Sequence, residues 1–368
     1  MTHAMVGSYT EPGMGNGTGV SRLELGDDGL LGSVQGASFG LRNPSFLALA
    51  GGVPYAVEEL ADGGLAALDP KTLAVTGRAP SGGADPCHLM VLDGNLWAAN
   101  YSSGTASVTP LEALGAGTSS RTSSGAYSGA SSPDSTTAAA PVLLSHPGSG
   151  PVADRQGESH AHQVTATPWG TVLVSDLGAD RVDEYSATSQ VLLGSAEMPP
   201  GSGPRHVVLK GDFLLVAGEL DGCLHVLRRT PLNPDDPAGT GHFWHWLFKA
   251  PLAGSEAEIA QAEQFFPSHL QLSDDSSRVF AAVRGPDTLV VLDVGGLDGE
   301  TPVAPSFLAQ VPSGGNWPRH FAVGSEKIYV ANQMSNNIAV FKLGQDGLPE
   351  PEPVQTLDIG SPACIVLA

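Results

Sequence analysis

The chain has 368 residues, only 15% of them charged, and carries a formal net charge of −21 at pH 7. Because phosphate groups are bound by clustered lysine and arginine, such an acidic chain argues against nucleic acid and against anionic membranes as partners. The 47 glycines and 29 prolines are typical of short strands separated by turns, so long helices are not expected.

The cysteines and the first residues indicate the compartment. Three cysteines, Cys87, Cys223 and Cys364, are an odd number without metal-ligand spacing, which argues against a disulfide framework. The opening residues, MTHAMVGSYT, contain neither a basic region nor a long apolar stretch, so we expect no signal peptide and no membrane span. These features predict a cytoplasmic protein.

One structural unit recurs along the chain, and each copy starts with a short signal that commonly contains Pro-x-His. The seven starts are NPSF at 43–46, DPCH at 85–88, SHAH at 159–162, GPRH at 203–206, FPSH at 266–269, WPRH at 317–320 and SPAC at 361–364. The first six are each followed by an apolar run that ends in polar residues, such as PYAVEE or FLLVAGEL, and then by a further β-rich run. Such repetition is typical of a β-propeller, and seven starts predict seven four-stranded blades.

The two ends of the chain complete one blade between them. The last start, SPACIVLA, supplies only a first strand, while the matching second and third strands, AMVGSYT and TGVSRLEL, stand at the N-terminus. We therefore expect a single all-β domain over residues 1–368, a seven-bladed propeller closed by a blade shared between the two ends. Since this sharing removes an open sheet edge, it should matter for stability.

Two segments lie outside the repeat. Residues 112–154 are dominated by Ser, Thr, Ala and Gly, and such a segment buries too little apolar surface to offset its ordering entropy, so it should be a flexible loop. Residues 231–266 contain Trp244 and Trp246, followed by SEAEIAQAEQFF, which predicts a short helix. The aromatic residues of this second insertion either line the rim of a pocket or pack the insertion onto a blade.

Alignment of the repeats brings polar residues to one mouth of the ring. The start of the inner strand and the end of its antiparallel neighbour lie on the same side of a blade. Five of seven aligned inner-strand residues are histidine, and the set is Phe46, His88, His162, His206, His269, His320 and Cys364. Two adjacent columns at the ends of the second strands read Ser8, Glu58, Asn100, Asp176, Gly218, Val283, Asn332 and Tyr9, Glu59, Tyr101, Leu177, Glu219, Arg284, Gln333.

These columns allow a structural and a functional interpretation. A histidine repeated at the strand starts can serve the fold alone by bonding backbone carbonyls of its own blade, above all at His88 and His269. Residues that break the repeat point to function, because blade packing does not require a residue that occurs in one or two blades. The exceptions are Arg205, Glu219, Arg284 and Arg319.

Several strings in this order carry a family resemblance, among them GSYT, NPSFLAL, ANYSSG, RQGESHAHQV, PGSGPRHVVL, WPRHF and ANQMSNNIAVF. They resemble the lactonase family of seven-bladed propellers, which includes bacterial 6-phosphogluconolactonases and fungal carboxymuconate-lactonising enzymes. The resemblance covers nearly the whole chain apart from the two insertions. It implies a cytoplasmic enzyme that acts on a small anionic lactone at the channel mouth, with catalytic residues His162, Arg205, Glu219 and Arg284.

Further substrate contacts are expected from residues that the columns or the family strings place near this mouth. They are His160, His206, Arg319, His320, Arg155, Asp176, Asn100 and Glu59.

The resemblance favours hydrolysis of 6-phospho-D-glucono-1,5-lactone to 6-phosphogluconate, a step of the pentose phosphate pathway. Arg205 and Arg284 would hold the anionic group or stabilise the oxyanion, because guanidinium groups suit both tasks. His162, titrating near neutrality, would activate water as a general base. Glu219 would orient that water or protonate the leaving alkoxide.

Two alternatives remain open at this point. In a carboxymuconate-type cycloisomerase the same arginines would bind carboxylates, and the acid–base group would move a proton during lactone formation. A noncatalytic propeller would instead present its loops to a protein partner, with Trp244 and Trp246 as contacts.

Metal dependence and assembly are also expectations from the sequence. Other lactonase propellers use calcium, but a calcium site needs several converging oxygen ligands, and the expected site here is rich in His and Arg. We therefore expect no metal and no other cofactor. We further expect a monomer or a weak homo-oligomer.

Overall fold

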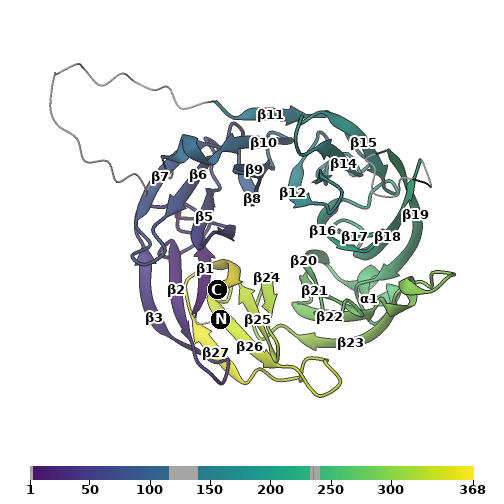
Figure 1. Cartoon of the computed structure of the whole chain (residues 1–368). Helices are drawn as coiled ribbons and strands as arrows, with labels where there is room; N and C mark the ends of the chain where they lie inside the picture. The colour runs from purple at the N-terminus through teal and green to yellow at the C-terminus, as the bar shows by residue number, and fades with distance from the viewer. Residues whose placement is uncertain (1–2, 116–139, 233–234, 236–240) are drawn as a thin grey trace.

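The computed structural model describes residues 3–115, 140–232, 235 and 241–368. Within them seven four-stranded antiparallel sheets stand around one axis, as the sequence predicts (Figure 1). Among the described residues, no helix has the length and apolar character needed to cross a bilayer.

Each blade contains four strands in the order inner, second, third and outer. The inner strands are β4 (Leu47–Ala50), β8 (Pro86–Leu92), β12 (Ala161–Ala166), β16 (Pro204–Lys210), β20 (Phe266–Leu272), β24 (Pro318–Val323) and β28 (Pro362–Leu367). The second strands are β5 (Val53–Glu58), β9 (Asn95–Asn100), β13 (Thr171–Asp176), β17 (Phe213–Gly218), β21 (Arg278–Arg284), β25 (Lys327–Asn332) and β1 (His3–Ser8).

The remaining strands complete the blades toward the rim. The third strands are β6 (Gly64–Leu68), β10 (Thr105–Pro110), β14 (Arg181–Ser186), β18 (Cys223–Pro231), β22 (Thr288–Asp293), β26 (Asn337–Lys342) and β2 (Val20–Leu25). The outer strands are β7 (Val75–Pro80), β11 (Val142–Ser145), β15 (Leu192–Glu197), β19 (His242–Pro251), β23 (Ser306–Pro312), β27 (Gln355–Asp358) and β3 (Leu31–Ser38). The helical elements in the described residues are α1 (Glu256–Gln261) and the 3₁₀ turns η1 (Leu111–Leu114) and η2 (Gly295–Asp298).

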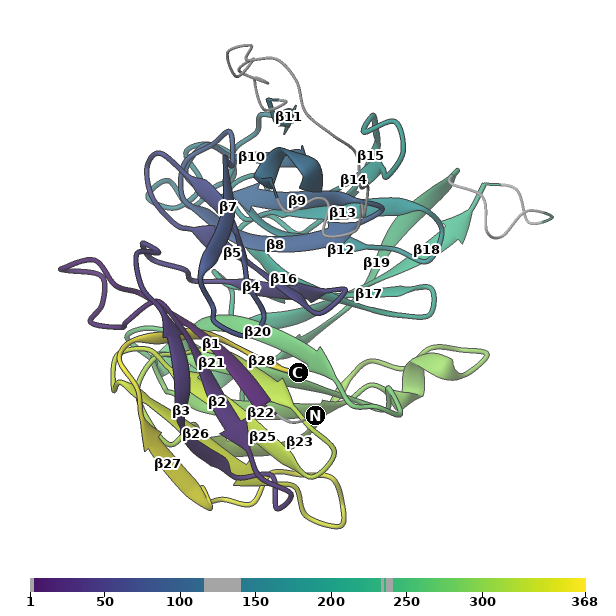
Figure 2. The same ribbon diagram turned by 60° about the vertical axis from the view of Figure 1, so that its left-hand side comes forward.

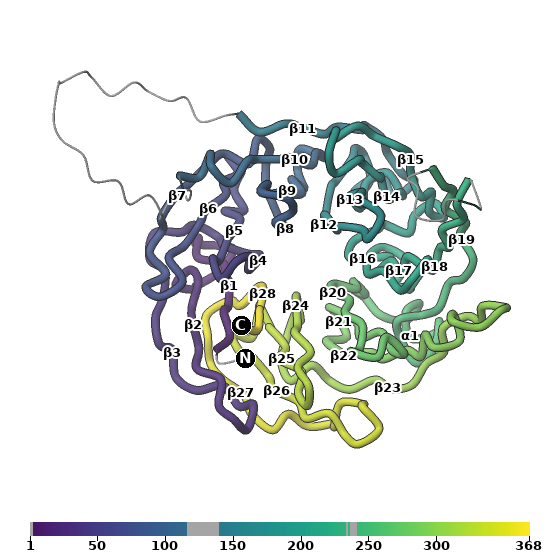
Figure 3. The backbone as a smooth tube through the Cα atoms, viewed as in Figure 1, coloured from purple at the N-terminus to yellow at the C-terminus, as the bar shows by residue number. Residues whose placement is uncertain are grey.

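The shared blade predicted from the two chain ends is present. Strand β28 pairs antiparallel with β1, so that Ala4 lies opposite Leu367 and Val6 opposite Ile365. The N–H of Ala368 also donates to the carbonyl of His3 at 2.9 Å. The backbone tube shows the two ends side by side in this blade (Figure 3).

The apolar cores lie between neighbouring sheets. One cluster joins Leu215 and Val226 to Val279 and Val290 of the next blade. Six further clusters each combine residues of two adjacent blades. Each blade is therefore stabilised by both of its neighbours, which is why an incomplete ring would leave two apolar faces exposed.

The two insertions contribute more to the blades than the sequence suggests. Strand β11 falls within 112–154 and β19 within 231–266, so each insertion supplies an outer strand. The low-complexity stretch of the first insertion, residues 116–139, lies outside the described residues. Helix α1 confirms the predicted short helix and protrudes from the rim (Figure 2). Trp244 packs partly buried against the neighbouring core, whereas Phe243 is 58% exposed.

Candidate active site

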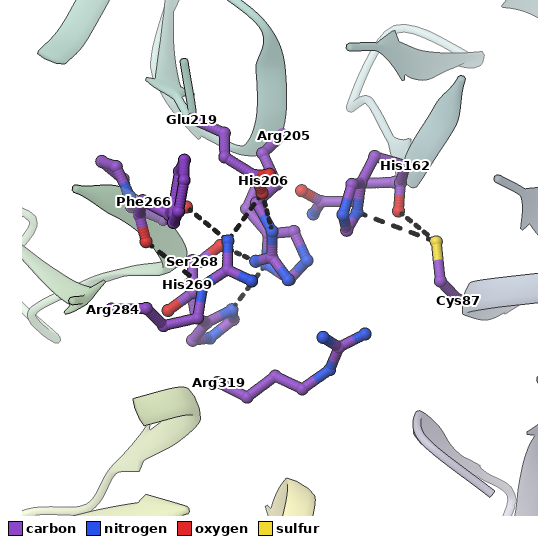
Figure 4. Close-up of polar contacts among 12 residues, drawn as sticks. Cys87, His162, Arg205, His206, Glu219, Phe266, Ser268, His269, Arg284 and Arg319 are labelled. Atoms are coloured by element: carbon purple, nitrogen blue, oxygen red, sulfur yellow. Dashed lines mark hydrogen bonds and ion pairs between the residues drawn. The ribbon is translucent and has the colours of Figure 1, made fainter. Parts of the chain in front are cut away.

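A β-bulge at the start of the inner strand explains the Pro-x-His signal. In β8, β12, β16 and β24 the register shifts directly after the first residue of the strand, and in β20 it shifts after the second residue, Pro267. In β16, for example, Pro204 pairs with Gly218 and Val207 pairs with Val216. Arg205 and His206 therefore lie opposite a single residue of β17, Ala217. Such a bulge re-aims side chains locally, and Arg205 and His206 both lie in the channel although they are consecutive (Figure 4).

The inner-strand histidines form a layer of rings across the axis, here called the histidine layer: His88, His162, His206, His269 and His320. The rings of His269 and His320 stack with centroids 3.8 Å apart, and Nδ1 of His206 lies 2.8 Å from Nδ1 of His269. Phe46 packs on His88 at 4.0 Å. His88 and His269 thus contact rings from other blades, which differs from the interpretation that they serve only their own blade.

Burial keeps this layer uncharged. Burial, His320 and Arg205 lower the pKa of His88 to about 3, and burial with Arg205 and Arg319 lowers the pKa of His320 to about 3. The pKa values of His206 and His269 are also well below the ordinary range, mainly because of burial. The close contact of His206 and His269 is therefore a hydrogen bond between one N–H and one lone pair.

Glu219 is the centre of an arginine cluster. Its Oε2 lies 2.8 Å from Nε of Arg205 and 2.7 Å from Nη2 of Arg284 (Figure 4). Its Oε1 lies 2.5 Å from Nη2 of Arg155. Burial alone would raise the pKa of Glu219, but the charges of Arg284 and Arg205 outweigh it and hold that pKa well below the usual range. Glu219 is therefore an ionised carboxylate, which does not suit the predicted role of proton donor.

The arginines of this cluster are held by further contacts. Arg205 is 2% exposed, and its Nη1 donates to the carbonyl of Ser268. Nε of Arg284 donates to the carbonyl of Phe266 at 3.2 Å. The side chain of Arg155 is 34% exposed and stands nearest to solvent. Burial and the charge of Arg284 lower the pKa of Arg205 from its ordinary value.

A second carboxylate lies on another side of the mouth. Oε2 of Glu59 accepts hydrogen bonds from the hydroxyls of Tyr9, at 2.8 Å, and Ser45, and lies 3.6 Å from Nη2 of Arg319. The guanidinium of Arg319 stands 5.1 Å from the centroid of the Tyr9 ring. With the four arginines positive, the two glutamates negative and the histidine layer neutral, these groups at the mouth together carry an excess of two positive charges.

His162 belongs to the histidine layer, and its ring centroid lies 5.7 Å from that of His206. Its Nδ1 is 3.7 Å from Sγ of Cys87, and its ring meets that of Tyr101 edge-on at 5.5 Å. Burial and the charge of Arg205 lower its pKa well below the ordinary value, while Glu219 opposes this shift. The prediction that His162 titrates near neutrality is therefore wrong, because the side chain is enclosed beside a cation. Burial also raises the pKa of Cys87, which keeps it a thiol.

His160 and Tyr101 line the mouth next to Arg155. The rings of His160 and Tyr101 stack with centroids 4.6 Å apart, and Nδ1 of His160 lies 3.1 Å from the carbonyl oxygen of Tyr101. Nη2 of Arg155 donates to the Tyr101 hydroxyl at 3.4 Å. The predicted site residues His160 and Arg155 thus both contact Tyr101.

Two residues predicted to contact the substrate, Asp176 and Asn100, instead form hydrogen bonds within their own blades. Oδ1 of Asp176 accepts from the N–H groups of His160 at 2.8 Å and Gly178 at 3.0 Å, and so caps a turn of its own blade. Asn100 is fully buried, and its Nδ2 donates to Thr105. Successive residues of a strand face opposite sides, so the column with Asn100 and Asp176 faces the blade interior while the next column faces the channel. We correct both assignments for this reason.

Four aromatic residues of the site were not among the substrate contacts predicted from the sequence. Tyr9 and Tyr101 stand in the same column as Glu59 and Glu219, and that column could have identified them. The other two directly precede the proline of their inner-strand start and pack against the guanidinium of Arg284, whose central carbon lies 5.9 Å from the ring centroid of Phe266 and 5.3 Å from that of Trp317.

Within the described part of the chain, no three His, Cys, Asp or Glu side chains are arranged to hold a metal ion. The chemistry available at the mouth is that of guanidinium groups, two carboxylates and neutral imidazoles.

A propeller of seven blades with this mouth has counterparts among known proteins. The chain belongs to the family described as lactonase, 7-bladed beta-propeller, whose model matches residues 3–367. As a member of this family it is a lactonase, a hydrolase of cyclic esters.

Individual relatives resemble the chain over different lengths. A 6-phosphogluconolactonase of Bacillus subtilis is 27% identical over 376 residues, which covers 98% of this chain and 96% of the relative. A 6-phosphogluconolactonase of Formosa agariphila is 29% identical over 209 residues, covering 53% of this chain and 54% of that protein. The periplasmic gluconolactonase of Pseudomonas aeruginosa has a TM-score of 0.79 at 23% identity, with 99% and 98% of the two chains covered, and so shares the fold.

Proposed function

We propose that this lactonase hydrolyses 6-phospho-D-glucono-1,5-lactone to 6-phosphogluconate, a step of the pentose phosphate pathway. The observation that carries the proposal is the excess of two positive charges at a largely buried mouth, since a phosphate monoester is close to a dianion at neutral pH. The name of the Bacillus subtilis relative, which is similar over nearly the full length, supports the same substrate.

The arginine cluster suits both ends of this substrate. Arg155, the most exposed of the four arginines, would receive the phosphate at the entrance, together with Arg319. Arg205 and Arg284 are almost fully buried and would face the lactone carbonyl, where a preorganised guanidinium stabilises the oxyanion most strongly. Glu219 would hold these guanidinium groups at fixed angles.

Hydrolysis then requires one water and one proton acceptor. The water oxygen bonds to the carbonyl carbon, and the bond from that carbon to the ring oxygen breaks. His162, an unprotonated imidazole across the physiological pH range, would take the proton from water and return it to the leaving ring oxygen. The carboxylic acid formed in this step releases the second water proton to solvent, so the final product is an open-chain carboxylate.

The first experiment compares three substrates with the purified protein. The rates of hydrolysis of 6-phosphogluconolactone, gluconolactone and carboxymuconolactone are measured above the spontaneous rate. We expect a rate that depends on the phosphate and falls by about 10²- to 10³-fold in Arg284→Ala. Arg42→Ala, which removes an exposed ion pair with Glu11, is the matched control and should keep full activity.

Other results of this substrate comparison would favour one of the alternative functions. Ring opening of carboxymuconolactone to carboxymuconate without addition of water would identify a cycloisomerase. No turnover of any of the three lactones would contradict the proposed substrate and favour a binding scaffold. A cytoplasmic location and a monomeric or weakly associated state belong to the same proposal. Cell fractionation and light scattering of the purified protein test these two points.

A further inference from the structure

The residue before the proline of an inner-strand start commonly adopts a left-handed backbone. Positive φ values occur at Asn43 (46°), Asp85 (52°), Gly203 (62°), Trp317 (65°) and Ser361 (37°). Glycine adopts this conformation freely and Asn or Asp tolerate it, but a bulky side chain is strained there. Trp317 is therefore the exception among these five positions, and such strain at a site is a reason to look for function.

The neighbouring blade holds Trp317 in this conformation. The Trp317 N–H donates to Oδ1 of Asp287 at 2.8 Å, and Nδ2 of Asn316 donates to the other carboxylate oxygen. Asp287 lies in the turn that begins directly after Arg284, at the end of β21. The turn that follows Arg284 thus fixes the backbone of Trp317.

The side chain of Trp317 packs against the guanidinium of Arg284. Its ring centroid is 5.3 Å from the guanidinium carbon of Arg284, and it meets the ring of Phe266 edge-on at 6.2 Å. Arg284 is therefore enclosed by two aromatic rings and by Glu219, which lies 2.7 Å from its Nη2. Aromatic faces attract a guanidinium and restrict its plane, an effect that Asn, Asp or Gly at position 317 would not supply.

Packing of the blades does not account for this tryptophan. Trp317 is only half-buried and belongs to none of the seven apolar clusters formed by the described residues. The strain at this position is thus not explained by a contribution to a core.

We infer that Trp317 is a positioning residue, which holds the guanidinium of Arg284 in the orientation needed at the lactone carbonyl. This inference rests on the proposed function for its substrate, but the placement of Arg284 is independent of that substrate. It adds to the catalytic set a residue that acts through Arg284.

The test compares Trp317→Asn with Trp317→Phe. The Asn variant relieves the backbone strain and removes the ring, so its Tm should be equal to or above that of the wild type. Its kcat/KM on 6-phosphogluconolactone should fall by about 10- to 100-fold, mostly in kcat, because a misplaced guanidinium stabilises the oxyanion poorly. Trp317→Phe should keep more activity than Trp317→Asn. Asp85→Asn, at the equivalent position of another blade, is the control and should change neither quantity.

A second readout does not require catalysis. The NMR signal of the Arg284 Nε–H, assigned by its loss in Arg284→Ala, should move and broaden in Trp317→Asn and stay in place in Asp85→Asn. If the wild type hydrolyses none of the lactones, the proposed function fails while this signal still decides the role of Trp317.

Three results would overturn the inference. The first is a kcat/KM of Trp317→Asn within twofold of the wild type. The second is a loss of activity that accompanies a large drop in Tm, since Trp317 would then be a packing residue. The third is an unchanged Arg284 signal in Trp317→Asn.

Discussion

Glu219 determines the chemistry of the mouth at the scale of single residues. One carboxylate contacts three guanidinium groups from three different blades or loops. Such a buried network is stable only while every charge has its partner, because an uncompensated buried charge is costly. Changing Glu219 should therefore alter both the geometry and the net charge of the site.

We expect Glu219→Gln to separate binding from catalysis. The glutamine keeps the size of the side chain but leaves one more positive charge uncompensated, so 6-phosphogluconate should bind at least as tightly as to the wild type. The kcat should fall by about 10²-fold, because Arg205 and Arg284 lose the group that orients them. Calorimetry of product binding and steady-state kinetics measure the two effects. Glu11→Gln, an exposed ion-pair partner, is the control, and an unchanged kcat in Glu219→Gln would exclude this role.

The pH dependence of the reaction reports on His162. The base form is required, and it is lost only as the pH falls through the folded-state pKa, which lies well below 6.5. After correction for spontaneous hydrolysis, kcat/KM should therefore stay level as the pH is lowered from about 7.5 through 6.5. An acid limb centred near pH 6.5 would show instead that a group with an ordinary imidazole pKa is the base.

Chelation tests whether a metal takes part. Because the mouth is lined by arginines, neutral imidazoles and two glutamates that already form ion pairs, we expect activity to survive dialysis against excess EDTA. Inductively coupled plasma analysis of the dialysed protein confirms removal. Loss of activity that calcium restores would contradict this expectation.

At the scale of elements, the bulged start of the inner strand does two things. It directs consecutive side chains into the channel, and it gathers histidines from five blades into one uncharged layer. The same layer makes the fold sensitive to acid. In the unfolded chain these histidines are free to take up protons, whereas in the folded protein they are not.

Stability should therefore fall as the pH is lowered. Below pH 6.5 the unfolded chain binds more protons than the folded one, so each such histidine lowers the free energy of unfolding by about 1.4 kcal/mol per pH unit, down to its folded pKa of about 3 for His88 and His320. Urea unfolding at pH 7, 6 and 5 measures this slope. His88→Leu should reduce it, whereas exposed His245→Gln should not. An equal slope in both variants would refute the assignment.

At the scale of the whole molecule, the ring depends on its shared blade. Strand β28 supplies Ile365 to one apolar core and Cys364 to the next, so it joins two blade interfaces. It also covers the edge of β1 with backbone hydrogen bonds. Without it, the ring would have an open edge on each side of the gap.

Removal of residues 362–368 should destabilise the entire propeller. We expect the Tm to fall by at least about 10 °C, or the protein to aggregate, because several kcal/mol of burial are lost at two interfaces. Scanning calorimetry compares this truncation with removal of Ala368 alone, which should be nearly neutral. A truncated protein with an unchanged Tm would show that closure contributes little.

The blade number, the shared blade and the main members of the arginine cluster can be predicted from the sequence alone. A repeat can be aligned without coordinates, and residues such as Arg205, Glu219 and Arg284 are visible as exceptions within their columns. Short strands with regular turns leave few alternative architectures, which is why this part of the prediction agrees with the structure.

The three-dimensional structure was needed to establish which of these columns faces the channel and what surrounds each side chain. Asn100 and Asp176 face their own blades, outer strands β11 and β19 lie within the insertions, and burial beside Arg205 lowers the pKa of His162. The pairing of Glu59 with Arg319 joins residues far apart in the chain. These features depend on bulges, on desolvation and on distances across the ring, which the order of residues alone does not specify.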